Sequence, residues 1–392
     1  MLNPSTVEPT LGELRDSASE ALVGDGLRVA IVSDAAPERN GVGAYYRDLA
    51  EHLKGVGAQV ELVAPRFRAG NWYGGLALPL PGDPTQKLLV PPLSLISRRL
   101  ARLAPHAIIV PTPGPYGLLG MHLAGRNRTK LIVGFHTHFE RLTDLFPGWR
   151  VRARVAQTFL TLSNRLLFRN SHLVLANSQE MVEVARSIGA VNLDVMGTSI
   201  PRRFLEHRAP PLNPEVSKVL FAGRLAPEKN LHAVVEAAHR LPKIEFQVAG
   251  DGPLRGWISD EAANLANLHY VGWVKRRRMI SLIDGVDCLV LPSKVESFGT
   301  IALEAMARGR LVVVSDQCGI NSWEPLNRGL FPMRKEETLA DILARIAGLD
   351  PAIRERKAQI ARAAARDMNE RNLAHWLEVL RQDETPPRNG ST

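Results

Sequence analysis

Short apolar runs of the kind that form buried strands alternate with helix-period stretches, and this alternation occurs twice along the chain. In the first half the strand-like runs lie at residues 28–33, 59–64, 107–110, 131–135 and 172–176. In the second half they lie at residues 218–222, 245–249, 268–271, 287–291 and 311–315. Strands separated by helices need crossover connections, which make the strands parallel and cover both faces of the sheet. The pattern predicts an α/β protein of two doubly wound, Rossmann-like domains facing a cleft, with ligands beyond the C-terminal strand ends.

A proline-rich stretch separates the two halves, because Pro201, Pro210, Pro211 and Pro214 interrupt regular structure there. The chain of 392 residues is also longer than one ordinary core supports. The predicted division is an irregular N-terminal extension (1–26), a first Rossmann-like domain (27–198), a linker (199–214), a second Rossmann-like domain (215–354), C-terminal helices that could cross back to the first domain (355–382) and a flexible tail (383–392).

Composition indicates a globular protein of the cytoplasm. Apolar residues make up 45% of the chain and charged residues 23%. No uninterrupted apolar run reaches the ~18 residues that span a bilayer. The first 26 residues carry acidic side chains and lack the basic start and apolar core of a signal peptide. Cys288 and Cys318 lie in or beside strand-like runs without metal-ligand spacing, so we expect two buried thiols.

Positive charge is concentrated in one part of the first half. The formal net charge is +9, and between residues 66 and 172 fifteen Lys and Arg residues stand against three acids, a surplus of twelve. The remainder of the chain therefore sums to minus three. Such a basic region attracts polyanions, which could be nucleic acid, anionic lipid or a phosphorylated substrate.

Three segments of the second half follow predicted strands and carry side chains suited to a phosphorylated ligand. They are residues 221–230 (FAGRLAPEKN), 249–253 (AGDGP) and 291–304 (LPSKVESFGTIALE). Arg224 and Lys229, at the mouth of the sheet, could neutralise a diphosphate. A helix beginning near Gly299 would add free backbone N–H groups and the positive end of its dipole.

Two glutamates belong to the same region. Glu304 would lie in the second turn of the predicted helix, where it could accept hydrogen bonds from a ribose diol, and Glu296 lies on the loop before it. Each feature alone has an ordinary explanation, since Gly-Asp-Gly is usually a plain turn and a cation after a strand is usually a solvated cap. Their joint occurrence, each at a strand end, is what predicts a nucleotide-binding site.

These segments are similar to those of the retaining glycosyltransferases of the GT-B fold, family 4 (glycosyltransferase group 1 type). The matching residues of the second half are Pro292, Ser293, Glu296, Phe298, Gly299 and Glu304, then 305–309 (AMARG), Gly223, Arg224, Lys229 and Asn230, Gly250, Asp251 and Gly252, and the loop 272–274. In the first half they are residues 40–43 (NGVG) and His136. The resemblance covers residues 28–380 and is most specific in the second half.

The resemblance implies an enzyme that moves a hexose from a UDP- or GDP-linked sugar with retention of anomeric configuration. Glu304 would bind the donor ribose, Glu296 would contact the transferred sugar, and Arg224 and Lys229 would hold the departing diphosphate. The implied catalytic residues are His136, Glu296, Arg224 and Lys229. The implied donor-binding residues are Gly41, Gly43, Gly223, Gly250, Asp251, Gly252, Val274, Ser297, Phe298, Gly299, Thr300 and Glu304. No Asp-x-Asp stands on a strand-end loop, so we expect no metal and no cofactor, and we do not assign Glu296 as a nucleophile.

Two assignments in the first half have alternatives. His136 could also cap its strand or fill a turn, and His138, two residues on, would face the same way. The loop 40–43 could be a flexible turn, or it could allow close backbone approach to donor phosphate or sugar. The sequence departs from the family pattern at residues 309–311, where Gly-x-Pro is common, and at 197–199, where Gly-Val-Asp is common. The identity of the donor therefore does not transfer from the resemblance.

The first domain would be the acceptor side, and two predicted helices there combine apolar stripes with arginines. One has Leu95, Ile96, Leu100 and Leu103 on one face with Arg98 and Arg102 beside it. The other has Val151, Val155, Phe159, Leu162 and Leu166, with Arg150, Arg154 and Arg165 off the stripe. These helices could pack on the sheet, or form a basic amphipathic surface that rests on anionic lipid. The leading hypothesis is a membrane-surface acceptor, such as diacylglycerol, a phospholipid or a polyprenyl-linked sugar; a soluble sugar or metabolite acceptor is the alternative.

Other classes of protein fit the sequence less well. A nucleic-acid-binding protein would show interleaved aromatic and basic strand residues, a helix-turn-helix or zinc spacing, and none is present. A dinucleotide oxidoreductase needs Gly-x-Gly-x-x-Gly after the first strand, which residues 34–43 do not supply. A catalytically silent binding module would be expected to have lost the two glutamates. We therefore predict a cytoplasmic glycosyltransferase, peripheral at the inner face of the membrane if its acceptor is a lipid.

Overall fold

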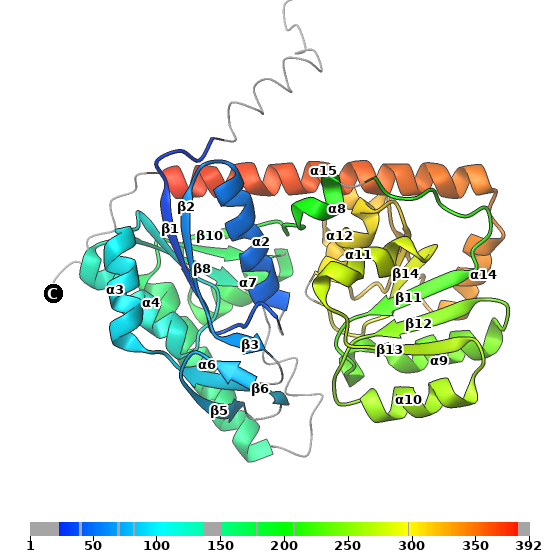
Figure 1. Cartoon of the computed structure of the whole chain (residues 1–392), viewed down its shortest axis with the longest axis horizontal. Helices are drawn as coiled ribbons and strands as arrows, with labels where there is room; N and C mark the ends of the chain where they lie inside the picture. Colours follow the sequence, from blue (N-terminus) through cyan, green and yellow to red (C-terminus); the bar gives the residue numbers. More distant parts are fainter. Residues whose placement is uncertain are drawn as a thin grey trace, which may run out of the picture.

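The computed structural model describes residues 23–38, 41–68, 71–80, 83–136, 150–177, 179–206, 208–296 and 298–382, and its two lobes lie side by side (Figure 1). Each lobe contains a six-stranded sheet. The α/β architecture of two Rossmann-like domains is thereby confirmed. Residues 1–22 and 383–392 of the predicted division lie outside the described residues, and the boundaries between the parts stay predictions.

The first sheet is parallel, with strand order β10-β9-β8-β7-β1-β2. Its strands are β1 (Arg28–Val32), β2 (Gln59–Val63), β7 (Ala107–Val110), β8 (Lys130–Phe135), β9 (Leu173–Ala176) and β10 (Leu193–Val195). Its helices are α2 (Gly41–Gly55), α3 (Leu93–Leu103), α4 (Pro115–Asn127), α6 (Arg150–Asn170) and α7 (Gln179–Ile188). Along β1, Val29 and Ile31 join a core with α2, whereas Ala30 and Val32 join a core with α3, α4 and α7. Because strand side chains alternate in direction, a run covered on both faces is apolar throughout.

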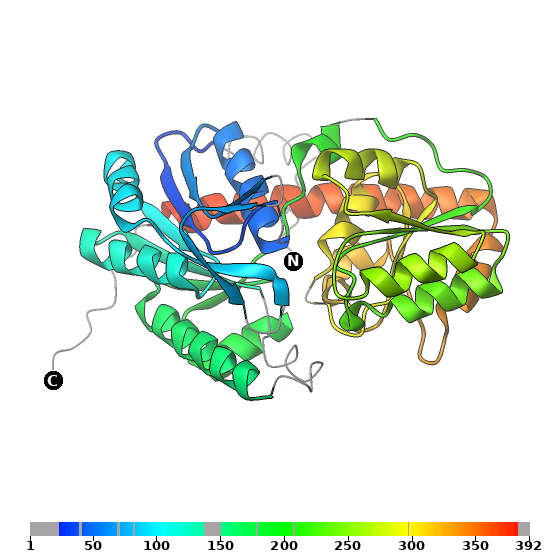
Figure 2. The same ribbon diagram turned by 60° about the horizontal axis from the view of Figure 1, so that its bottom comes forward.

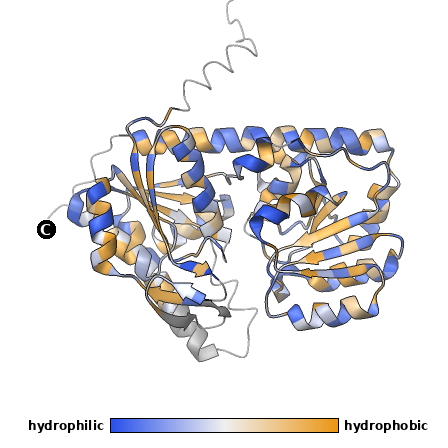
Figure 3. Ribbon diagram, viewed as in Figure 1, coloured by the Kyte–Doolittle hydropathy of each residue, from blue (hydrophilic) through white to orange (hydrophobic). Residues whose placement is uncertain are grey.

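The second sheet is also parallel, with strand order β13-β12-β11-β14-β15-β16. Its strands are β11 (Lys218–Ala222), β12 (Glu245–Ala249), β13 (Leu268–Gly272), β14 (Cys288–Leu291), β15 (Leu311–Val314) and β16 (Phe331–Pro332). Its helices are η2 (Pro227–Lys229), α9 (Leu231–Arg240), α10 (Arg255–Asn264), α11 (Arg276–Asp284), α12 (Thr300–Ala307), η3 (Gly319–Ser322), α13 (Glu324–Asn327) and α14 (Leu339–Ala347), with α8 (Arg202–Glu206) before the sheet. The strands of both sheets are mostly apolar, and the helices around them are mixed (Figure 3).

All ten predicted strands are present, but two hairpins between β2 and α3 were not predicted. β3 (Arg66–Arg68) pairs with β4 (Asn71–Tyr73), and β5 (Leu76–Leu80) pairs with β6 (Asp83–Val90), both antiparallel. β3 and β4 are three residues each, and β5 contains Pro79, which weakens a strand signal. The short outer strands β10 and β16 were missed for a similar reason of length.

The last helix, α15 (Pro351–Arg381), belongs to the cores of both lobes, and it runs along both of them in Figures 1 and 2. Ala358 and Ala365 pack in the core of the second lobe, while Trp376 and Leu377 pack in the core of the first. Trp376 is fully buried, and its indole N–H donates to the hydroxyl of Tyr45 on α2 at 2.8 Å. Neither α15 nor another helix of the described residues is long and apolar enough to cross a membrane.

We predict that Trp376→Ala destabilises the protein by about 3–5 kcal/mol, because it removes a fully buried aromatic side chain and leaves a cavity. Denaturant unfolding followed by far-ultraviolet circular dichroism measures this loss. Ile353→Ala is the matched control, since Ile353 lies on the same helix and is 55% exposed. Equal unfolding midpoints for the two variants would contradict the proposed docking of α15 on the first lobe.

Candidate active site

The second sheet reverses its strand order between β11 and β14. From β11 the chain moves outward to β12 and β13, and from β14 it moves outward in the opposite direction to β15 and β16. Loops that leave two such neighbouring strands diverge, which makes this switch point the usual ligand position in an open α/β sheet. Arg224 and Lys229 lie on the loop after β11, and Glu296 lies on the loop after β14.

Two ion pairs form on these loops. Nζ of Lys229 lies 2.6 Å from Oε2 of Glu296, and Nη1 of Arg224 lies 3.5 Å from Oε1 of the buried Glu228. Burial alone would lower the pKa of Lys229, but attraction and a hydrogen bond from Glu296, with the charge of Glu228, outweigh it and raise the pKa. The lysine therefore stays protonated at neutral pH.

Two hydrogen bonds to backbone carbonyls hold the loops after β11 and β14 against each other. The backbone N–H of Lys294 donates to the carbonyl of Glu228 at 2.8 Å. The side-chain amide of Asn230 donates to the carbonyl of Pro292 at 3.2 Å. Asn230 has φ +53° and separates η2 from α9, a conformation that Asn tolerates better than most residues. These hydrogen bonds hold in place the two loops that carry the ion pair of Lys229 and Glu296.

The Gly-Asp-Gly turn after β12 packs tightly against the loop after β11. A Cβ at Gly250 (φ +150°) would lie 1.8 Å from the carbonyl oxygen of Gly223, and one at Gly252 (φ +157°) 2.6 Å from that of Leu225. The N–H of Leu225 donates to the carbonyl of Asp251 at 3.1 Å. Local packing alone therefore explains why both positions are glycine. The predicted donor contacts of Gly250, Asp251 and Gly252 stay predictions.

Helix α12 begins where the sequence predicted. Gly299 is its N-cap, with φ +94°, and Thr300 is its first residue. A Cβ at Gly299 would lie 3.0 Å from Sγ of Cys318, and the buried ring of Phe298 packs edge-on against Trp323. The first N–H groups of a helix have no partner within it, so this end can receive an anion. Both cysteines are free and buried, as expected.

A chain of buried charges links Glu304, in the second turn of α12, to the first lobe. Nη2 of Arg276, the first residue of α11, donates to Oε1 of Glu304 at 2.7 Å and pairs with Oδ2 of Asp48 on α2. Asp48 is 1% exposed and Glu304 5%. Burial raises the pKa of both carboxyls, that of Asp48 to about 7, although the charge of Arg276 acts to lower both.

His136 lies at the C-terminal end of β8 and contacts α2. Its Nε2 is 2.9 Å from the hydroxyl of Tyr46, and its ring centroid lies 5.4 Å from that of Tyr45. Gly134 makes this approach possible, since a Cβ there would lie 1.9 Å from the Tyr46 hydroxyl. Burial lowers the pKa of His136 to about 3, so the imidazole is neutral at physiological pH.

Gly41 and Gly43 of the predicted loop 40–43 lie in the first turn of α2. A Cβ at Gly43 would lie 2.5 Å from the carbonyl oxygen of Ala35, so this glycine is required by local packing. At Gly41, no described atom lies within 4 Å of such a Cβ, which leaves space beside the backbone. Asn40 lies outside the described residues.

The structure adds three charged residues to which sequence reasoning gave no role: Glu228, Asp48 and Arg276. Asp48 could have been noticed because it is the one acidic residue among the buried residues of α2. Arg276 belongs to the run KRRR at residues 275–278, and cations are disfavoured at the N-terminus of a helix. Of the predicted set, Gly223, Thr300 and Val274 are at least partly exposed beside these loops, whereas Ser297 and the alternative His138 lie outside the described residues.

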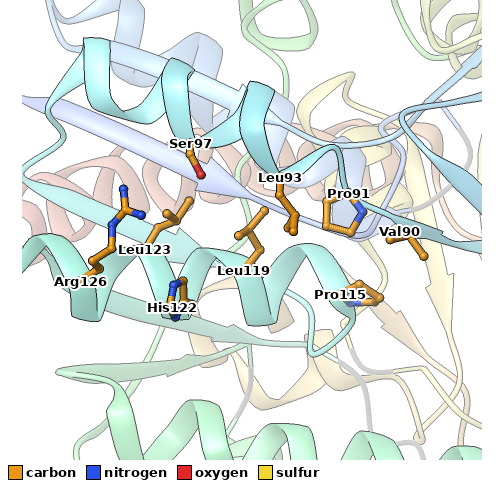
Figure 4. A pocket seen from close by; sticks show the side chains of 9 residues that line it. All are labelled: Val90, Pro91, Leu93, Ser97, Pro115, Leu119, His122, Leu123 and Arg126. Atoms are coloured by element: carbon orange, nitrogen blue, oxygen red, sulfur yellow. The ribbon is translucent and has the colours of Figure 1, made fainter.

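A hollow of about 520 Å³ lies elsewhere, between α3 and α4 of the first lobe (Figure 4). Its walls are mainly apolar, with three polar side chains among them. The lining residues are Val90, Pro91, Leu93, Ser97, Pro115, Leu119, His122, Leu123 and Arg126. It is formed by the helices on the face of the first sheet that does not carry α2.

Two family models match successive parts of the chain. "Glycosyltransferase Family 4" matches residues 39–197 and "Glycosyl transferases group 1" matches residues 203–364. Alpha-D-kanosaminyltransferase of Streptomyces kanamyceticus is 30% identical over 62% of this chain and 66% of its own length. Glycogen synthase of Mycobacterium tuberculosis is 31% identical over 37% of each chain. A GDP-mannose-dependent alpha-(1-6)-phosphatidylinositol dimannoside mannosyltransferase of the same species is 26% identical over 56% of this chain and 60% of its own. The chain thus spans less than two thirds of these relatives.

Solved structures share the fold over almost their full length. Sucrose-phosphate synthase from Thermosynechococcus elongatus superimposes with a TM-score of 0.68 at 17% identity, covering 90% of this chain and 98% of that one. HepE from Anabaena, in complex with UDP and glucose, gives 0.65 at 16% identity with the same coverage. The chain belongs to the glycosyltransferases of family 4, group 1, with the GT-B fold, as its motifs indicated.

We predict that the His136 imidazole stays neutral down to about pH 4, which its ring-proton chemical shifts in nuclear magnetic resonance would show. Between the ordinary pKa of 6.5 and the folded pKa of about 3, the unfolded chain takes up a proton that the folded chain does not. The stability due to this residue is therefore complete above pH 6.5 and is lost as the pH falls toward 3. His136→Gln assigns the resonance, and a titration centred near pH 6.5 would contradict the buried site.

Proposed function

We propose that the protein transfers a hexose from a UDP- or GDP-linked sugar, with retention of configuration and without a metal ion, to a lipid or lipid-linked acceptor at the cytoplasmic face of a membrane. The observation that carries the donor assignment is the ion pair of Lys229 and Glu296 at the switch point, beside Arg224 and the start of α12. The HepE structure is a complex with UDP, and the related mannosyltransferase is GDP-mannose-dependent by its name. Both UDP and GDP therefore stay candidates for the donor nucleotide.

Lys229 can bind a diphosphate without losing Glu296. An ammonium group has three donors, and among the described residues only Glu296 accepts from this one. The carboxylate therefore holds the lysine in position while two N–H groups remain for phosphate oxygens. The ion pair is a means of preorganisation, which reduces the reorganisation needed when charge develops.

In the proposed reaction, the bond between the sugar C1 and the diphosphate oxygen breaks and a bond from C1 to the acceptor oxygen forms on the same face. The acceptor proton passes to an oxygen of the departing nucleoside diphosphate. Arg224, Lys229 and the α12 N-terminus would stabilise the negative charge of that leaving group, the task that a metal ion performs in other sites. Glu296 and the neutral His136 would orient hydroxyl groups of the transferred sugar.

The acceptor assignment rests on helix α6, whose apolar stripe faces solvent. Phe159, Leu162 and Leu166 are 41%, 57% and 46% exposed, while Ser163 and Asn164 beside them are buried. Leu167 and Phe168 of the same helix are buried in the core, so α6 carries apolar side chains on its solvent face in addition to its buried face. Arg165 and Arg169 on the same helix are exposed. An exposed apolar stripe with cations beside it fits a surface that enters the headgroup layer of an anionic membrane.

The apolar residues of helix α3 are divided between the core and the surface. Ile96 and Leu100 pack in the core, as the packing interpretation holds, but Leu93 and Leu95 are exposed. Leu93 also lines the hollow between α3 and α4, and so does Arg126. One relative acts, by its name, on a phosphatidylinositol dimannoside, which supports a lipid acceptor.

We predict that Lys229→Ala and Arg224→Ala lower kcat by about 10²-fold or more, because each removes a charge that stabilises the leaving group. Glu304→Ala should mainly raise the donor KM. The measurement is steady-state donor hydrolysis with UDP- and GDP-sugars, repeated with lipid extract. Lys218→Ala is the matched control, a half-exposed lysine at the opposite end of β11, and it should leave both constants unchanged.

Unchanged kinetics in all three site variants would overturn the donor site. The same assay with a chelator tests metal independence, and loss of activity that added Mg²⁺ or Mn²⁺ restores would overturn that part of the proposal. Transfer to a soluble sugar without lipid or detergent would instead establish the alternative acceptor class.

We predict that anionic liposomes bind the protein, that salt releases it, and that Leu162→Ser with Leu166→Ser weakens sedimentation with the vesicles by about tenfold. The physical reason is loss of the apolar area that would be buried in the membrane. Val191→Ser is the control, because Val191 is 87% exposed but lies outside the α6 stripe. Equal sedimentation with neutral and anionic vesicles would remove the membrane-surface hypothesis.

A further inference from the structure

The chain of charges from Asp48 through Arg276 to Glu304 is the feature of the site that the proposed mechanism does not use. It joins α2 of the first lobe to α11 and α12 of the second. Arg276 is the first residue of α11 and follows Lys275, so two cations lie where the helix dipole disfavours them. Nothing in the stability of α11 itself favours arginine at this position.

Interface stability does not explain the chain of charges either. Taking two carboxylates and a guanidinium out of water carries a desolvation cost that apolar side chains of similar volume would avoid. One guanidinium also faces two carboxylates, and no described residue accepts from its Nε. Because this arrangement costs folding stability, it points to a role for the charges in binding.

The geometry leaves Glu304 able to bind a ligand while Arg276 holds it. Arg276 donates to Oε1, and among the described residues no group donates to Oε2. A carboxylate offers about four lone-pair sites over its two oxygens, so a ribose diol can bind both oxygens without displacing the guanidinium. Burial raises the pKa of Glu304, and the charge and hydrogen bond of Arg276 act to lower it, so the guanidinium favours the charged form of the carboxylate.

We propose that Asp48 and Arg276 are positioning residues of the donor site, in which Asp48 orients Arg276 and Arg276 orients Glu304 toward the ribose hydroxyls. This inference rests on the proposed donor role of Glu304. It gives the first lobe a part in nucleotide recognition, because Asp48 belongs to α2 and reaches the nucleotide only through the second lobe. Nucleotide affinity then depends on how the two lobes are placed.

The test is isothermal titration calorimetry with UDP and GDP, and with their 2′,3′-dideoxy analogues, on the full chain. Asp48→Asn keeps the shape of the side chain and removes the charge that Asp48 carries above its pKa of about 7, so the titrations are run at pH 8. We expect it to weaken ribonucleotide binding about tenfold, as loss of a charge-assisted contact does. Binding of the dideoxy analogue should not change, and Asp48→Asn should add nothing in a Glu304→Gln background. Arg276→Lys, which loses the planar fork, should weaken ribonucleotide binding likewise.

Arg277→Lys is the matched control, since Arg277 is the exposed neighbour in the same run, and it should bind like the wild type. Unchanged or tighter ribonucleotide binding by Asp48→Asn would overturn the positioning role, as would equal losses for ribose and dideoxyribose nucleotides. If Glu304→Gln weakens ribonucleotide binding while Asp48→Asn does not, only this inference fails. If the wild type binds neither nucleotide, or Glu304→Gln binds like it, the proposed function fails and the inference with it.

Discussion

The reversal of strand order between β11 and β14 is the constraint on which the proposed donor site depends. Parallel strands place all their C-terminal ends at one edge, and the reversal makes the two central loops diverge there. Lys229 and Glu296, 67 residues apart in the chain, meet at 2.6 Å for this reason. The tight glycine packing after β12 and the braced loop at Asn230 keep that meeting point fixed. The contact between Lys229 and Glu296 therefore depends on the strand order of the sheet as well as on the two side chains.

The first lobe is brought to this edge by two helices. Helix α15 packs in both cores, and Trp376 bonds to Tyr45 on α2. The same α2 supplies Tyr46 to His136 and Asp48 to Arg276. A single helix thus carries the glycine loop, the partner of the predicted histidine and the ionic link to the second lobe. A shift of α2 along the first sheet would alter all three at once.

Much of the fold could be predicted because buried parallel strands are continuous apolar runs, and ten of the twelve strands in the two parallel sheets were found. The residues Arg224, Lys229, Glu296 and Glu304 could be placed at strand ends because their motifs are local. Their pairing could not, because it depends on the distance between loops far apart in the sequence. Asp48 was missed for the same reason, since nothing near it in the chain shows that Arg276 faces it. Strands β3 and β4 carry too few residues to give a period, and Pro79 weakens the strand signal of β5.

The charges of the chain act in two separate ways. On the loops of the proposed donor site the cations Arg224 and Lys229 are paired with Glu228 and Glu296, so the contribution of these loops would be preorganised geometry rather than a surplus of charge. The surplus of twelve positive charges lies in residues 66–172, which include α3, α4 and α6 on the face of the first sheet opposite α2. At physiological salt the screening length is about 8 Å, so exposed arginines on that face contribute little to nucleotide binding. Their effect is on whatever approaches that surface, and the exposed apolar stripe of α6 is where the proposed anionic membrane would bind.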